Sequence, residues 1–208
     1  MTVQLAAVLL AASLAGLGAE RLRTPAPAVQ AEAPPASVQL SDEELRGRIE
    51  SFLGAIDTPV RADQWKALGP AAIPILQQIA QDQGQLPSRR ARALHGLAVI
   101  GGPEAERTVL EVARSPGERF QVRAAALRGA GRLLPPDRLS AELRPVLEGA
   151  NRVQVRAAAA EVRARHAQEG GCAAMRAQVE REKGDDRAFY HRALRTCEES
   201  ERPKASKP

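Results

Sequence analysis

The fold is decided by the stretch VRAAALRGAGRLLPP, residues 122–136, because its pattern recurs along the chain. Two series of residues share a spacing of 33 and one common frame: Pro70, Pro103 and Pro136, and Arg90, Arg123 and Arg156. Each unit predicts two helices, since an alanine-rich first helix is followed by a Gly or Pro break and a second helix at the periodic proline. Neither helix could bury its apolar face alone, so we expect stacked pairs that share one core.

The expected helices follow from this frame and from local signals. Three first helices are predicted at residues 88–100, 122–134 and 155–166, and three second helices at 70–81, 103–115 and 136–149. Ser41-Asp42-Glu43-Glu44 has the form of a capping box and predicts an earlier amphipathic helix that runs to about Asp57. Pro145 predicts either a kink in its helix or a helix that starts only near Ser140.

Composition agrees with an all-α chain. Apolar residues make up 44% of the sequence, which is enough for a packed core, whereas aromatic residues make up only 2%. Alanine is abundant and the β-branched and aromatic residues that favour strands are scarce. The shortage of aromatic side chains also argues against a haem or flavin pocket and against a surface on which nucleic-acid bases stack.

Three segments resemble one repeat family. Residues 122–127 (VRAAAL) and 155–160 (VRAAAA) resemble the first helix of short HEAT repeats, and residues 68–76 (LGPAAIPIL) resemble the second. These are HEAT-like repeats of the phycobilisome-lyase type. Over roughly residues 57–183 the resemblance implies a right-handed α-solenoid of antiparallel helix pairs, which we place at 41–200 with its cap. Such solenoids serve many roles, so the resemblance predicts the fold and leaves the function open.

The N-terminal region predicts export. Residues 3–19, VQLAAVLLAASLAGLGA, contain no charge and resemble the apolar core of a signal peptide over residues 1–19. An uncleaved membrane anchor is the alternative, because about 17 apolar residues is the lower limit for crossing a bilayer. Residues 20–40 are rich in Pro and Ala and predict an extended linker, and residues 201–208 predict a disordered tail. We therefore expect an exported protein in the periplasm or cell envelope of a bacterium.

No catalytic or metal motif stands out. The three histidines, His95, His166 and His191, are far apart and match no pattern of metal ligands. The sequence has no phosphate-binding Gly-Lys-Ser/Thr loop and no Gly-x-Ser-x-Gly elbow, and neither cysteine has a nearby histidine. We expect no cofactor, no metal and no enzymatic activity.

Arginines provide the candidate binding residues. The net charge is +5, and the 33-residue frame aligns seven arginines into rows: Arg90, Arg123 and Arg156; Arg119 and Arg152; Arg132 and Arg165. Such rows would suit a partner rich in carboxylates or phosphates, because arginine offers a planar pair of donors. The alternative is that these arginines pack their stems and pair with glutamates of the neighbouring repeat, for which Glu118, Glu148 and Glu161 are available.

Together these features favour a non-catalytic protein-interaction or scaffold module of the bacterial cell envelope. The sequence does not identify its protein partner, and an acidic protein is one candidate. Binding of a polyanion, either nucleic acid or anionic lipid, through the arginine rows is the alternative. A predicted leader and a single Trp argue against nucleic acid. A third possibility is an accessory subunit of an enzyme.

The two cysteines predict a disulfide. Cys172 opens the predicted helix 172–183 and Cys197 ends the predicted helix 186–197, and the turn at Gly184-Asp185 lies midway between them. Residues equidistant from the turn of an antiparallel hairpin face each other, so a bond between Cys172 and Cys197 is expected, with a Cα separation of ~5.5–6 Å. Two buried thiols are the alternative. An oxidising compartment would favour the bond.

Overall fold

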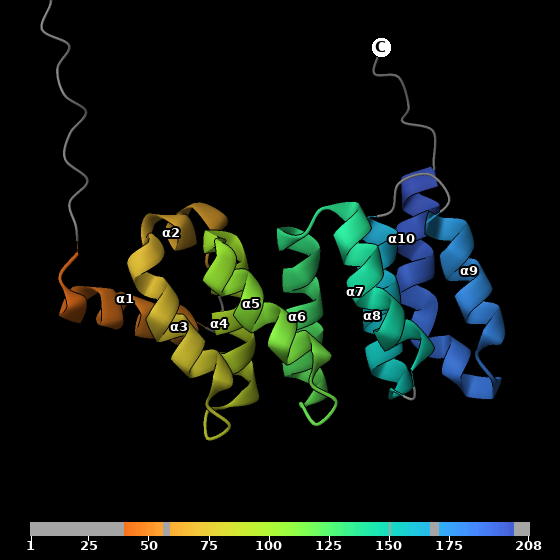
Figure 1. The fold of residues 1–208 in the computed structure, drawn as a ribbon, viewed down its shortest axis with the longest axis horizontal. Coiled ribbons are helices and arrows are strands. Elements are labelled where there is room, and N and C mark those ends of the chain that lie inside the picture. The colour runs from red at the N-terminus through yellow and green to blue at the C-terminus, as the bar shows by residue number, and fades with distance from the viewer. Residues whose placement is uncertain (1–39, 56–58, 150, 167–170, 202–208) are drawn as a thin grey trace, which may run out of the picture. The chain divides into compact units, whose positions relative to one another are not determined.

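A computed structural model describes residues 40–55, 59–149, 151–166 and 171–201, all within the compact unit Gln39–Pro208. The predicted signal peptide or anchor, nearly all of the predicted linker and the tail after residue 201 lie outside the described residues. Every regular element in the described ranges is helical, which confirms the all-α prediction (Figure 1). The elements are α1 (Asp42–Gly54), α2 (Ala62–Ala67), η1 (Pro70–Ala72), α3 (Ile73–Gln81), α4 (Pro87–Ile100), α5 (Pro103–Arg114), α6 (Phe120–Leu133), α7 (Pro136–Glu148), α8 (Val153–Arg165), α9 (Gly171–Arg181), η2 (Gly184–Tyr190) and α10 (His191–Glu201).

The helix starts follow from the signals in the sequence. The predicted capping box is present at α1, where the Glu44 amide donates to Ser41 Oγ at 3.3 Å and the Ser41 amide donates to Glu44 Oε2 at 2.9 Å. The three periodic prolines occupy the first positions of η1, α5 and α7, as predicted. Gly69 and Gly102 precede two of them with positive φ angles of 68° and 95°, a conformation that favours glycine.

Three expected boundaries are corrected. Helix α1 ends at Gly54 rather than near Asp57, and the helix predicted from Pro70 begins as the short 3-10 helix η1 before α3 starts at Ile73. The expectation of a late start near Ser140 is wrong, because α7 begins at Pro136 and runs through Pro145. Its buried face, Leu139, Leu143, Val146 and Leu147, continues on both sides of that proline. This packing outweighs the single backbone hydrogen bond that proline cannot make.

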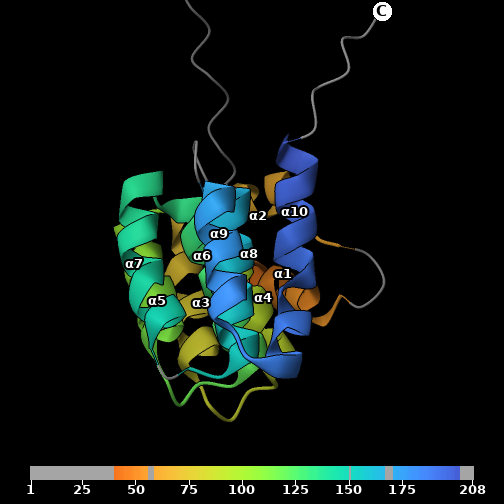
Figure 2. The same ribbon diagram turned by 90° about the vertical axis from the view of Figure 1, so that its right-hand side faces the viewer.

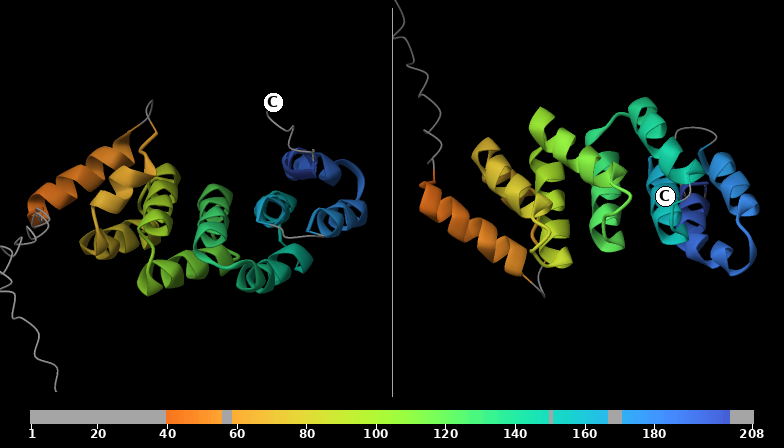
Figure 3. Two further views of the ribbon diagram at one scale, coloured as in Figure 1. Left: turned by 90° about the horizontal axis from the view of Figure 1, so that it is seen from above. Right: turned by 60° about the horizontal axis from the view of Figure 1, so that its bottom comes forward.

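The helices of the three units form two layers. Helices α3, α5 and α7 lie on one side, and α4, α6 and α8 lie on the other, as the view from above shows (Figure 3). Each second helix packs against the first helix that follows it, so that α3 contacts α4, α5 contacts α6 and α7 contacts α8. Within the other layer, α4 contacts α6 and α6 contacts α8. The core between the layers is built from leucine, valine and alanine, for example Leu94, Val109, Leu127 and Leu143.

The two ends of the layered helices are covered by different helices. Helices α1 and α2 pack against α4, whereas α10 packs against α8 with α9 beside it (Figure 2). The predicted Cys172–Cys197 bond is confirmed, since the two sulfurs are joined and the Cα atoms are 5.5 Å apart. The predicted helix 186–197 is corrected, because residues Gly184–Tyr190 form the 3-10 helix η2 and α10 starts only at His191.

Candidate binding groove

One predicted arginine row is built into the core. Arg90, Arg123 and Arg156 are each the fourth residue of their helix, in α4, α6 and α8. The Nε atoms of Arg90 and Arg123 donate to the carbonyls of Ala80 at 2.9 Å and Ala113 at 2.8 Å, near the ends of α3 and α5. The guanidinium groups of Arg90 and Arg123 therefore each satisfy a carbonyl at the end of the preceding helix.

The other donors of these arginines reach the next helix pair. Arg90 Nη2 lies 2.5 Å from Glu118 Oε2, Arg123 Nη1 donates to Asn151 Oδ1 at 2.8 Å, and Arg156 Nη2 lies 2.5 Å from Glu182 Oε2. The three acceptors directly precede α6, α8 and η2. We call these bridges the arginine rungs: Arg90–Glu118, Arg123–Asn151 and Arg156–Glu182.

The rungs correct the expectation of a surface row at these positions. Arg90 is only 1% exposed and Arg123 only 4%, so their donors face the protein and not a partner. The fourth residue of each of these helices points toward the end of the preceding helix and the turn before the next pair, where its donors find acceptors. The alternative, pairing with a glutamate of the neighbouring repeat, holds for Arg90, which pairs with Glu118. Arg156 pairs with Glu182 rather than with Glu148 or Glu161.

The second row lies at the helix starts. Arg119 and Arg152 are the N-cap residues of α6 and α8, and both are exposed. The third row, Arg132 and Arg165, lies near the opposite ends of the same two helices and lines a groove. The structure thus separates the three rows rather than joining them into one surface.

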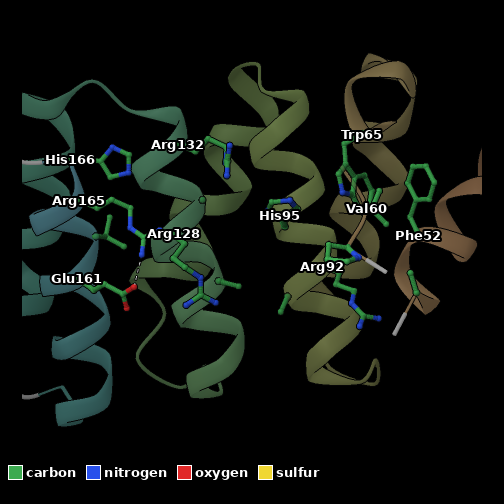
Figure 4. A pocket seen from close by; sticks show the side chains of 16 residues that line it. Phe52, Val60, Trp65, Arg92, His95, Arg128, Arg132, Glu161, Arg165 and His166 are labelled. Carbon is green, nitrogen blue, oxygen red and sulfur yellow. Dashed lines mark hydrogen bonds and ion pairs between the residues drawn. The ribbon is translucent and has the colours of Figure 1, made fainter. Parts of the chain in front are cut away.

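The groove has a volume of about 720 Å³ and opens along α4, α6 and α8, with α1 and α2 at one end (Figure 4). We call it the arginine groove. Its lining residues are Phe52, Ala55, Pro59, Val60, Trp65, Ala91, Arg92, His95, Ala125, Arg128, Gly129, Arg132, Glu161, Val162, Arg165 and His166. The lining contains four arginines and only one carboxylate, that of Glu161, so it is strongly cationic.

The arginines of the groove differ in how they are satisfied. Arg165 Nη2 lies 2.7 Å from Glu161 Oε1, and Arg92 donates to the carbonyl of Leu53. Arg128 and Arg132 have no hydrogen-bond acceptor among the residues that the structure describes. They are four residues apart on α6, where like charges repel each other. This pair is the unbalanced part of the groove.

The pKa values of the titratable groups reflect the same positive potential. Burial lowers the pKa of Arg128, and the charges of Arg192 and Arg165 lower it further against the opposing effect of Glu161. Burial also lowers the pKa of His95, with further contributions from Arg132 and Arg128. Both effects favour loss of a positive charge, as expected where cations gather without enough anions.

His166 experiences the same potential at the α8 side. Burial lowers its pKa, and the neighbouring charges of Arg165 and Arg132 lower it further. An anion bound in the groove would oppose this effect for both histidines.

The end of the groove at α1 and α2 is apolar. The rings of Phe52 and Trp65 meet edge to face, with centroids 5.1 Å apart, and Val60 lies beside them. Trp65 is only 1% exposed, and its indole N–H is buried without a hydrogen-bond acceptor in the described part of the chain. Buried indole N–H groups usually have a partner, so this donor is unusual.

Sequence reasoning missed most of this site, although a signal was present. The 33-residue frame aligns His95, Arg128 and Glu161, just as it aligns Arg132 with Arg165. His95, Arg128 and Glu161 lie five positions after the rung arginine of the same helix, and Arg132 and Arg165 lie nine positions after it. On a helix, these spacings place them on the opposite side from the rung arginine, toward the groove. The sequence alone identified Arg132 and Arg165 but not Arg92, Arg128 or Trp65.

Comparison of the chain with known protein families, curated proteins and solved structures found no match. None of the helices in the described ranges is long and apolar enough to cross a membrane. Across those same residues, no three side chains of His, Cys, Asp or Glu are grouped to hold a metal ion.

Proposed function

We propose that this chain is a non-catalytic protein-interaction module that holds an acidic segment of a partner protein in the arginine groove. One observation carries the proposal: Arg128 and Arg132 extend from one face of α6 into the groove and have no acceptor in the described residues. Both residues are exposed, so their guanidinium groups are accessible to a partner. Arginines bind carboxylates through paired, charge-assisted hydrogen bonds, and an acidic segment would supply carboxylates in place of water.

We also propose that the paired helices form a right-handed HEAT-like α-solenoid. The 33-residue spacing of the prolines, the two layers of helices and the arginine rungs at equivalent positions support this assignment. Extended repeat surfaces commonly bind other proteins along one face. The arginine groove would be that face.

Export to the periplasm or cell envelope is the proposed location. The Cys172–Cys197 bond supports it, because disulfides persist in oxidising compartments, and the apolar residues 3–19 resemble a leader. Fractionation of the native cells tests the location directly, since the proposal requires the full-length or processed chain in the envelope fraction. Recovery in the cytosol alone would contradict it.

The binding proposal is tested by cross-linking the intact chain in its native envelope and identifying the peptides attached to the groove. Arg128→Ala/Arg132→Ala is the test variant, and Arg107→Ala/Arg144→Ala, on exposed positions of α5 and α7, is the matched control with the same charge. We expect one partner that is lost in the test variant, kept in the control and attached through an acidic segment. Equal capture by both variants would contradict the proposal.

A salt titration separates a protein partner from a polyanion. Binding to heparin or to anionic vesicles would weaken steeply with salt, because each neutralised phosphate or sulfate releases counterions. If heparin binds tightly at moderate salt while no acidic protein is retained, polyanion binding replaces the proposed function.

A further inference from the structure

We infer that the arginine groove recognises a bipartite peptide segment, with a carboxylate at Arg128 and Arg132 and an apolar side chain at Phe52 and Val60, beside the buried Trp65. This inference rests on the proposed function and specifies the chemistry of the acidic partner. Its starting point is that one groove contains both a cationic end and an apolar end (Figure 4).

The cationic end is suited to one carboxylate. Arg128 and Arg132 are one helical turn apart, and the repulsion between them is relieved when one anion accepts hydrogen bonds from both. Glu161, the single carboxylate of the lining, is already engaged by Arg165 at 2.7 Å and lies 3.9 Å from Arg192. Arg128 and Arg132 are exposed and are left available, so a partner would supply the anion that binds between them.

The apolar end is suited to an apolar side chain. Phe52 and Val60 are partly exposed in the groove and would be covered by an apolar side chain of the partner. Trp65 is buried behind Phe52, with ring centroids 5.1 Å apart, so it reports on a bound side chain through its contact with Phe52.

His95 joins the two ends. Its ring lies edge to face with that of Trp65, with centroids 6.4 Å apart, and it is also close enough to Arg128 and Arg132 for their charges to lower its pKa. Figure 4 shows His95 between the arginines and the aromatic pair. A single short segment can therefore contact both ends, which favours one continuous peptide over two separate ligands.

The same geometry disfavours nucleic acid and lipid. Bases bind single-stranded sites by stacking on exposed aromatic faces, whereas Trp65 is 1% exposed. Gly96 lies against this indole, since a Cβ added at Gly96 would be 2.7 Å from Trp65 Cε3. An anionic bilayer would need cations on a protruding surface, and here they line a hollow.

Trp65 is the single tryptophan of the chain, so its fluorescence reports on the apolar end alone. The probes are synthetic peptides without tryptophan: acetyl-Phe-(Gly)n-Glu-Glu-amide with zero to three glycines, the same series with Gln in place of Glu, and the same series with Gly in place of Phe. Binding is measured by calorimetry with the full chain, and the emission of Trp65 is recorded at each addition.

At the best spacing we expect the Phe–Glu peptide to bind about tenfold more tightly than either incomplete peptide and to shift the emission of Trp65. Arg128→Ala/Arg132→Ala should abolish the advantage of Glu over Gln, while Arg107→Ala/Arg144→Ala should leave it unchanged. Circular dichroism and the melting temperature of each variant show that it is folded. A folded test variant that keeps the advantage of Glu overturns the assignment of the carboxylate end.

The outcomes separate this inference from the proposed function. Should the peptides with and without Phe bind equally at every spacing, or bind without moving the emission of Trp65, the bipartite inference is overturned while acidic binding stands. Should no acidic peptide bind through Arg128 and Arg132, both are overturned. Binding of heparin or of phosphatidylglycerol vesicles in place of every peptide would also overturn both.

Discussion

A buried arginine is tolerated only where its N–H donors find acceptors, and Arg90, which is 1% exposed, meets that condition. It donates to the carbonyl of Ala80 and to the carboxylate of Glu118, whose side chain is only 3% exposed. Burial raises the pKa of Glu118, but the hydrogen bonds from Arg90, the amide of Arg119 and Gln83 outweigh it, so that the net pKa lies below its usual value. The pair is charged on both sides.

Removal of one partner should therefore be costly. Arg90→Met should lower the free energy of unfolding by about 3–5 kcal/mol, because Glu118 is left buried without its counter-charge. Denaturant unfolding followed by circular dichroism measures the change. The double variant Arg90→Met/Glu118→Met should recover most of the loss, and Arg107→Met, at an exposed position, should stay within about 0.5 kcal/mol of the parent. A loss in Arg90→Met as small as that in Arg107→Met would contradict the structural role.

Glu182 makes stability depend on acid pH. The hydrogen bond from Arg156 is the main cause that lowers the pKa of Glu182 from 4.5 to about 2, and Tyr190 Oη also donates to Glu182 at 2.6 Å. Because the folded pKa is depressed, this carboxylate stabilises the fold above its unfolded pKa, and the contribution is lost as the pH falls toward about 2.

We therefore expect the stability of the parent to fall between about pH 4.5 and pH 2. Glu182→Gln should be less stable than the parent at neutral pH and should show a shallower fall across this window. Thermal melts at half-unit steps of pH provide the comparison. Parallel pH profiles for the two proteins would refute the coupling.

At the scale of elements, local signals predicted the helices well because they act within a few residues. A capping box, a proline at the first helical position and an apolar stripe each need only their neighbours in sequence. The direction in which a helical side chain points depends in addition on how adjacent pairs are staggered. That is why the sequence groups Arg123 correctly with Arg90 but predicts both on the surface.

The close contact between α4 and Trp65 of α2 requires a glycine at position 96. A Cβ there would lie 2.7 Å from Trp65 Cε3, so Gly96→Ala must displace the indole ring. We expect a loss of stability of about 1–3 kcal/mol, from overpacking, together with a shift in tryptophan emission. Gly47→Ala in α1 is the control, since no atom lies within 4 Å of the added Cβ, and it should be neutral or stabilising.

Helices α9 and α10 are joined by the Cys172–Cys197 bond. Cys172→Ser/Cys197→Ser should lower the free energy of unfolding by about 3.5 kcal/mol on the chain-entropy model, for a closed loop of about 26 residues. Hydrogen exchange should show faster opening of α9 and α10 than in the parent, with α4 and α6 less affected. Dithiothreitol should reproduce the change in the parent and do nothing to the variant.

At the scale of the whole molecule, the arginine groove is assembled from residues far apart in the sequence. The side chains come mainly from α1, α2, α4, α6 and α8, so no local motif could reveal the groove, and only the 33-residue frame links any of them in the sequence. Arg132 and Arg165 were identified through that frame. The frame does not identify Trp65, because its place in the groove depends on contacts with Phe52 and Gly96 that cannot be read from the sequence.

The groove should bind acidic peptides more tightly as the pH falls. The pKa values of His95 and His166 are lowered in the free protein, and a bound carboxylate would raise them, so binding takes up protons. Affinity should increase from pH 7.5 to pH 5.5, by up to about tenfold for each histidine whose pKa rises by one unit. His95→Asn/His166→Asn should flatten this dependence, while His191→Asn, outside the groove lining, should preserve it. Calorimetry at several pH values decides the matter.

The arginine rungs also bear on how such a chain could lengthen. Glu118 and Asn151 occupy equivalent positions, and each receives the arginine of the pair before it. A tandem duplication that placed a second copy of residues 118–150 after residue 150 would bring its own glutamate to meet Arg123 and its own arginine to meet Asn151. The added pair would keep an arginine and its acceptor at both of its borders, so one genetic step could add a pair without breaking this pairing.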